Sequence, residues 1–96
     1  MNTKKVWFVT GASKGLGLTL TRKLLAQGFR VAATSRSKKS LIEEIGEENE
    51  NFLPIEMDLT NNQNVKEGIN ATISHFGSID VLVNNAGYSQ IGTLEE

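Results

Sequence analysis

The fold of this chain is decided by residues 6–17, which read Val-Trp-Phe-Val-Thr-Gly-Ala-Ser-Lys-Gly-Leu-Gly. The first four residues are apolar without alternation, a pattern typical of a strand buried on both faces inside a parallel sheet. A glycine-rich turn follows. Leu16, Leu20 and Leu24 then repeat four residues apart, which predicts an amphipathic helix with these leucines on its inner face. The stretch therefore predicts a strand, a tight turn and a helix in immediate succession.

The same alternation continues along the rest of the chain. Apolar segments predict further strands at residues 31–36, 52–57 and 79–83, and helical patterns lie between them at residues 40–45 and 60–76. An order of strands separated by helices calls for a parallel sheet with right-handed crossovers. Pro54 has no amide proton to donate, so the third strand belongs near a sheet edge. We predict a three-layer, Rossmann-type doubly wound α/β sandwich with strand order 3-2-1-4.

The third helix has the most detailed signature. Thr60 and Gln63 have the spacing of a capping box, in which each side chain bonds the backbone at the other residue. Gly77 provides a natural helix end. The predicted inner stripe consists of Val65, Ile69, Ile73 and Phe76. On the strand before this helix, alternation places Leu53, Ile55 and Met57 on one common face.

The glycine turn carries the chemistry. A phosphate group binds where backbone N–H groups and the positive end of a helix meet, and side chains must not block its approach. Gly11 allows the tight turn, Gly15 the approach of a pyrophosphate, and Gly17 the packing of the helix against the sheet. The spacing is G-x-x-x-G-x-G rather than G-x-G-x-x-G, and it is not a P-loop. The alternative is a helix start where glycines only turn the chain.

Three segments together resemble the short-chain dehydrogenase/reductase family: residues 10–17, Asp58-Leu59 and Asn84-Asn85-Ala86-Gly87. The resemblance extends over essentially the whole chain. It implies that the glycine turn holds a cofactor pyrophosphate, that Asp58 contacts an adenine ring, and that residues 85–87 lie along the adenosine ribose. It also implies that residues 84–87 help to fix the central sheet. The candidate binding residues are Gly11, Ser13, Lys14, Gly15, Leu16, Gly17, Arg36, Asp58, Leu59, Asn85, Ala86 and Gly87.

The end of the second strand distinguishes NADP(H) from NAD(H). A free ribose 2′-hydroxyl prefers a carboxylate there, whereas a 2′-phosphate requires cations. This strand ends at Ser35 rather than at Asp or Glu, and Arg36 follows. Lys14 in the glycine turn adds a second cation on the same side. The pattern favours NADP(H) over NAD(H); the alternative is that Arg36 and Lys14 are ordinary surface cations.

No catalytic residue is assigned. The family uses a Tyr with a Lys four residues later, together with a Ser and an Asn, but Tyr88 is followed four residues later by Gly92. Residues 93–96 have the spacing of another capping box. We therefore expect residues 1–96 to be the N-terminal, cofactor-binding part of a single Rossmann domain, inactive alone. The expected parent is an NADP(H)-dependent oxidoreductase of carbonyls or alcohols; the alternative is a non-catalytic dinucleotide-binding or redox-sensing module.

Composition narrows the remaining classes. The net charge of −1 gives no field to recruit nucleic acid or an anionic membrane. The absence of cysteine excludes disulfides and thiolate metal sites, and the single histidine, His75, has no second ligand grouped with it, so no metal site is predicted. No apolar run is long enough for a signal peptide or a membrane span. We expect a cytoplasmic protein, and the resemblance implies a homo-oligomer at full length.

Overall fold

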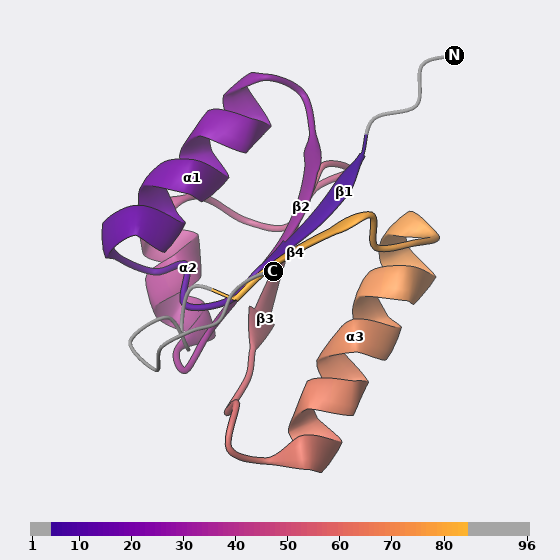
Figure 1. Cartoon of the computed structure of the whole chain (residues 1–96). Helices are drawn as coiled ribbons and strands as arrows, with labels where there is room; N and C mark the ends of the chain where they lie inside the picture. Colours follow the sequence, from indigo (N-terminus) through magenta and orange to yellow (C-terminus); the bar gives the residue numbers. More distant parts are fainter. Residues whose placement is uncertain (1–4, 85–96) are drawn as a thin grey trace.

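The computed structural model describes residues 5–84, and in this part of the chain strands and helices alternate. They are β1 (Val6–Val9), α1 (Gly15–Ala26), β2 (Arg30–Ser35), α2 (Lys38–Glu44), β3 (Phe52–Glu56), α3 (Asn62–Phe76) and β4 (Val81–Val83). The strands form one parallel sheet in the order β3-β2-β1-β4. In Figure 1, α1 and α2 cover one face of this sheet and α3 covers the other. The predicted three-layer architecture and strand order are confirmed.

The core lies in two layers because neighbouring residues of a strand point to opposite faces. On the face of α1 and α2, Val9 and Val31 pack against Leu24 and Leu41, all nearly inaccessible to solvent. On the face of α3, Phe8 and Ala32 pack with residues of β3 and α3. The inner strands β1 and β2 therefore have buried residues on both faces. This explains why residues 6–9 are apolar without alternation.

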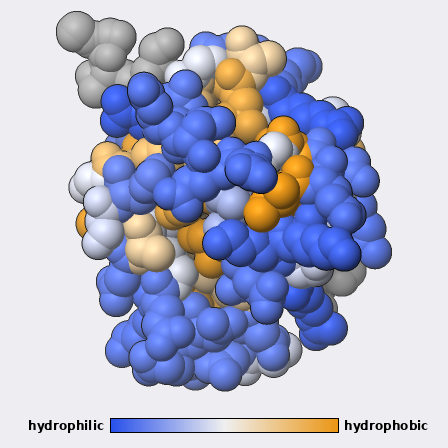
Figure 2. All heavy atoms as spheres, turned by 180° about the vertical axis from the view of Figure 1, so that it is seen from behind, coloured by the Kyte–Doolittle hydropathy of each residue, from blue (hydrophilic) through white to orange (hydrophobic). Residues whose placement is uncertain are grey.

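The outer strand β3 bears out the expectation drawn from proline. Pro54 pairs with Ala33 of β2, and β3 is an edge of the sheet, where a missing amide donor removes no interior ladder bond. Leu53, Ile55 and Met57 share the face toward α3, as predicted. In the described residues β4 is the opposite edge, and its Leu82 side chain is 63% exposed. Figure 2 shows hydrophobic atoms reaching the surface among hydrophilic ones on one side of the molecule.

Leu16 corrects the predicted inner face of α1. Its side chain is 75% exposed, and the buried residues of the helix are Gly17, Thr21 and Leu24. Successive residues of a helix are rotated by about 100°, so a face centred on Gly17 and Thr21 turns Leu16 away from the sheet. Leu20 is partly buried beside this face. A glycine at the contact allows the close approach that a leucine would prevent.

The start of α3 corrects the predicted capping box. The N-cap is Asn61, whose Oδ1 accepts a hydrogen bond from the Asn64 amide at 3.0 Å. Thr60 does not cap the helix, because its hydroxyl donates instead to Asp58. Ile73 was predicted to face inward, but it is 45% exposed, since Gly68 and Thr72 form the buried face. Gly77 ends α3 in the left-handed conformation, with φ of 95°.

Element boundaries also shift, since β2 is Arg30–Ser35 rather than 31–36 and β3 ends at Glu56 rather than at 57. Two further shifts are larger. The predicted helix at residues 40–45 begins earlier, at Lys38, because Ser37 caps it by accepting a hydrogen bond from the Ser40 amide at 3.2 Å. The predicted strand at 79–83 narrows to Val81–Val83. Ile79 packs instead against the core on the α3 face. Both shifts concern element ends, where a local side-chain contact decides the boundary.

Candidate functional site

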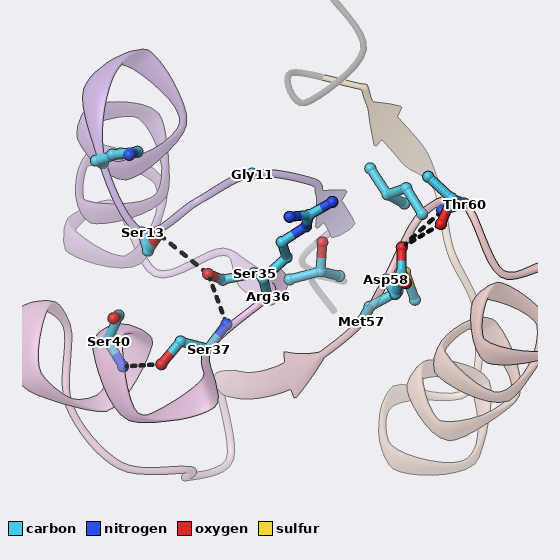
Figure 3. A pocket seen from close by; sticks show the side chains of 12 residues that line it. Gly11, Ser13, Ser35, Arg36, Ser37, Ser40, Met57, Asp58 and Thr60 are labelled. Carbon is cyan, nitrogen blue, oxygen red and sulfur yellow. Dashed lines mark hydrogen bonds between the residues drawn. The ribbon is translucent and has the colours of Figure 1, made fainter.

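An open cavity of about 510 Å³ lies beyond the carboxyl ends of β1, β2 and β3. It is formed by the three loops that follow these strands, so residues far apart in the sequence meet there. Figure 3 shows the side chain of Arg36 between those of Ser13 and Asp58. The lining residues are Gly11, Ser13, Lys14, Thr34, Ser35, Arg36, Ser37, Ser40, Met57, Asp58, Leu59 and Thr60.

The glycine turn forms one wall of the cavity. Gly11 and Gly15 have φ of 63° and 64°, a left-handed backbone that residues with a Cβ adopt only with strain. The Ala12 amide donates to the Thr34 carbonyl at 2.9 Å, which fastens the turn to β2. Lys14 is the N-cap of α1, and no side chain makes a capping hydrogen bond there. The first turn of α1 therefore has backbone donors without a side-chain acceptor, and the helix dipole makes this end positive.

Hydroxyl groups organise the wall after β2. The Ser35 hydroxyl donates to Ser13 Oγ at 3.0 Å and accepts from the Ser37 amide at 3.2 Å. The hydrogen bond from the Ser37 amide to Ser35 Oγ spans two residues and closes a tight turn around Arg36. Arg36 itself is exposed and lines the cavity. The wall thus combines a guanidinium with hydroxyl groups, and no carboxylate ends the strand.

Asp58 supplies the negative charge of the cavity, in the loop after β3. Its Oδ1 accepts hydrogen bonds from the Thr60 hydroxyl at 2.6 Å and from the Thr60 amide at 2.9 Å. The pKa of Asp58 lies below its ordinary value. The largest cause is the hydrogen bond from the Thr60 hydroxyl, followed by that from the Thr60 amide, and the Arg36 guanidinium contributes less. The carboxylate form is therefore favoured at neutral pH.

The end of β4 is tied to the start of the glycine turn. The Thr10 amide donates to the Val83 carbonyl at 3.0 Å, and the Thr10 hydroxyl donates to Asn84 Oδ1 at 3.1 Å. Asn84 thus helps to hold β4 against β1, as the resemblance implies for residues 84–87. Residues 85–87, which the resemblance places along the adenosine ribose, lie outside the described residues.

A model of the family described as short chain dehydrogenase matches residues 5–96. The chain belongs to the short chain dehydrogenase family. This agrees with the structure, in which the three segments that carry the resemblance follow β1, β3 and β4. The predicted membership is confirmed.

Named relatives and solved structures agree with this assignment. An oxidoreductase of Botryotinia fuckeliana is 37% identical over 95 residues, which are 96% of this chain and 34% of the relative. A 3-oxoacyl-acyl-carrier-protein reductase of Staphylococcus epidermidis is 40% identical, covering 85% of this chain and 35% of the relative. The crystal structure of a short-chain dehydrogenase from Streptomyces avermitilis is similar with a TM-score of 0.79 and 31% identity, covering 86% of this chain and 31% of that one. The chain spans about a third of the length of these relatives.

A further structure is informative about ligands. The 3-ketoacyl-(acyl-carrier-protein) reductase from Brucella melitensis was crystallised in complex with NADH. It is 28% identical to this chain with a TM-score of 0.75, and the similarity covers 81% of this chain and 32% of that one.

The structure brings half of the predicted binding residues to one cavity. Those that line it are Gly11, Ser13, Lys14, Arg36, Asp58 and Leu59. Gly15, Leu16 and Gly17 do not line it but form the first residues of α1. Gly17 is buried against the sheet, in agreement with its predicted packing role, and a Cβ at Gly15 would meet nothing within 4 Å. The space beside Gly15 is therefore open to a ligand.

Sequence reasoning did not assign several lining residues to the site. They are Thr34, Ser37, Ser40, Met57 and Thr60. Met57 was placed only in the core and Thr60 only at a helix start. For Thr34, Ser37 and Met57 the available signal was position, because they lie at or just after the carboxyl end of a strand, where ligands of open α/β sheets bind.

His75, the single histidine of the chain, lies away from this cavity. His75 Nε2 is 3.2 Å from the Asn49 carbonyl oxygen, and Nδ1 is 3.8 Å from Glu48 Oε2, near the amino end of β3. Among residues 5–84, no group of three or more His, Asp or Glu side chains could hold a metal ion. No helix in that range is long and apolar enough to cross a membrane.

Proposed function

We propose that the cavity beyond β1, β2 and β3 binds NADP(H), and that the longer protein is an NADP(H)-dependent oxidoreductase. The observation that carries the proposal is the end of β2. Ser35 stands where a carboxylate would select the free 2′-hydroxyl of NAD(H), and Arg36 and Lys14 line the same cavity. A guanidinium suits a phosphate because its planar fork donates two hydrogen bonds at once.

The groups in and next to the cavity fit the rest of a dinucleotide. The positive end of α1 and the open space beside Gly15 suit a pyrophosphate. The Ser13 hydroxyl lines the cavity beside Ser35 and suits hydrogen bonding to a ligand oxygen. Asp58, ionised at neutral pH, is the residue proposed to contact the exocyclic amine of adenine. Residues 85–87 are proposed for the adenosine ribose.

For the longer protein we propose a carbonyl reductase or alcohol dehydrogenase acting on a small molecule. The bound cofactor supplies or accepts hydride at its nicotinamide ring. The residues described here bind and orient it, and the groups that exchange a proton with substrate are expected in the part of the relatives that this chain does not span. A cytoplasmic location and a homo-oligomeric state at full length stay predictions.

The proposal is tested by titrating the 96-residue chain with NADPH and NADH and following the fluorescence of the reduced nicotinamide. We expect NADPH to bind at least about tenfold more tightly, since charge-assisted hydrogen bonds to one phosphate contribute roughly 1.5–3 kcal/mol. Arg36→Ala should remove most of this preference. Arg22→Ala is the matched control, because Arg22 is an exposed arginine that bonds Glu44 rather than lining the cavity. Equal affinities for the two cofactors would contradict the NADP(H) preference, and no binding of either would contradict dinucleotide binding.

A further inference from the structure

Ser35 joins three walls of the cavity at one residue. Its hydroxyl donates to Ser13 in the glycine turn and accepts from the Ser37 amide in the loop after β2. Its carbonyl oxygen accepts from the Met57 amide at 2.9 Å, which anchors it to the end of β3. Figure 3 shows the hydroxyl contacts as a continuous chain from Ser13 through Ser35 to Ser37.

The Ser35 hydroxyl already has two partners in this structure. It shares a hydrogen bond with the Ser13 hydroxyl, and either oxygen of this pair can donate because a hydroxyl proton rotates. It also accepts a hydrogen bond from the Ser37 amide, whose proton has a fixed direction. The contact with Ser37 is therefore the one through which Ser35 shapes the loop after β2.

Arg36 is the residue through which Ser35 acts. It is the middle residue of the turn that the Ser35–Ser37 hydrogen bond closes, so this bond restricts the backbone from which the guanidinium extends. The long side chain of arginine has many rotamers, and ordering it costs free energy when a ligand binds. A fixed backbone removes part of that cost. Ser37 in turn caps α2, which holds the far side of the turn in place.

We propose that Ser35 is a positioning residue that sets the preference for NADP(H) by holding the turn that presents Arg36. The inference rests on the proposed function of the cavity and adds a residue that acts through the turn around Arg36. Ser35 is then more than the absence of a carboxylate: its hydroxyl contributes to the selectivity.

The decisive pair of variants is Ser35→Thr and Ser35→Val, which have the same shape and differ in the hydroxyl group. Both are β-branched and suit the end of a strand. Titration of each 96-residue chain with NADPH and NADH measures the ratio of the two dissociation constants. We expect Ser35→Thr to keep the wild-type ratio and Ser35→Val to lower it about fivefold, a typical effect of one hydrogen bond. The affinity for NADH should stay within about twofold, because NADH has no 2′-phosphate for Arg36 to bind.

A double variant tests whether the effect passes through Arg36. In the Arg36→Ala background, adding Ser35→Val should change the ratio by less than about twofold, since the two residues act as one unit. Ser74→Ala, an exposed serine on α3, controls for loss of a hydroxyl elsewhere. If Ser35→Val does not fold, as judged by circular dichroism, Ser35→Ala replaces it.

The outcomes separate the inference from the function it rests on. A wild-type chain that binds neither cofactor, or both equally, overturns the proposed function and the inference together. A wild-type preference that Ser35→Val retains overturns the inference alone. So does an equal loss of NADPH and NADH affinity, which would show a purely structural role. A loss in the double variant that equals the sum of the single losses also overturns it, because Ser35 would then act independently of Arg36.

Discussion

The helices α1 and α3 lie on opposite faces of the sheet and contact it with the same pair of residue types. In α1 the Thr21 hydroxyl donates to the Gly17 carbonyl at 2.8 Å, and in α3 the Thr72 hydroxyl donates to the Gly68 carbonyl at 2.9 Å. All four residues are buried. In each helix the glycine allows close approach to the sheet, and the threonine satisfies its buried hydroxyl within the helix itself.

The two helices differ in how they begin. The first turn of α3 has a side-chain cap from the protein, because Asn61 Oδ1 accepts a hydrogen bond from the Asn64 amide. The first turn of α1 begins at Lys14 and has no side-chain cap. A helix end without a protein acceptor is free to interact with an anion. The comparison indicates that equal packing faces serve different purposes: α3 completes the fold, whereas α1 completes the fold and leaves one end to the cavity.

The largest expected effect is on the buried glycine that lets α3 pack closely against the sheet. Gly68→Val should lower the free energy of unfolding by roughly 3 kcal/mol, the upper range for overpacking a well-packed contact. A Cβ at Gly68 would overlap the terminal methyl of Met57, which must move, and it would already contact Ile55 Cγ2 at 3.5 Å, so the two further methyl groups of valine crowd this contact. Urea denaturation measures the change. Ala71→Val, at an exposed position of the same helix, is the control, and equal effects of the two would refute the packing argument.

The next largest effect is expected on stability, at the N-terminus of α3 that Asn61 caps. Asn61→Ala should destabilise the protein by about 1 kcal/mol, because it removes the acceptor for the Asn64 amide. The affinity for NADPH should not change. Asn62→Ala, one residue along and without the capping hydrogen bond, should have a much smaller effect in the same denaturation experiment. A loss from Asn62→Ala as large as that from Asn61→Ala would mean that the cap is not what stabilises this end.

The N-terminus of α1, which has no side-chain cap, should respond in the opposite way. A substitution there should change the affinity for NADPH and leave the free energy of unfolding nearly unchanged. Lys14→Ala removes no capping hydrogen bond, so its effect on the free energy of unfolding should stay within about 0.5 kcal/mol. It should weaken NADPH binding about threefold, the scale of one partly screened charge interaction. Lys23→Ala, in the last turn of the same helix, provides the control titration. If Lys14→Ala destabilises the fold as Asn61→Ala does, the two helix ends are not specialised differently.

The smallest expected effect is on the pKa of Asp58, in the loop before α3. Thr60→Val removes the hydroxyl that contributes most to lowering the pKa of Asp58, so this pKa should rise toward its ordinary value of 3.8. Because the pKa in the folded state lies below that value, the stabilisation is present at pH above 3.8 and is lost as the pH falls through the lowered pKa. Thr60→Val should therefore reduce the dependence of stability on pH in this acidic range. An NMR titration of the Asp58 carboxyl carbon measures the pKa, and an unchanged value would contradict the assigned cause.

Local patterns in the sequence, together with the family resemblance that pointed to Asp58 and Leu59, were enough to predict the layers, the strand order and half of the cavity. Residues 6–9 had to be buried on both faces because they are apolar without alternation, and Pro54 had to lie at an edge because it has no amide donor. The left-handed backbone of Gly11 agrees with the tight turn that was predicted there because glycine permits it. These features are determined over a few neighbouring residues, so a short stretch of sequence contains the information.

Only the tertiary structure decided features that depend on contacts between distant residues. Leu16 looks like a core residue, but the closeness of the sheet to Gly17 turns it to solvent. Thr60 has the spacing of a helix cap, but Asp58 takes its hydroxyl. The bond between Ser13 and Ser35 joins residues 22 positions apart and becomes visible only once β1 and β2 lie side by side. The sequence determined which residue types stand at the carboxyl end of each strand, whereas the parallel pairing of the strands decided which of them meet.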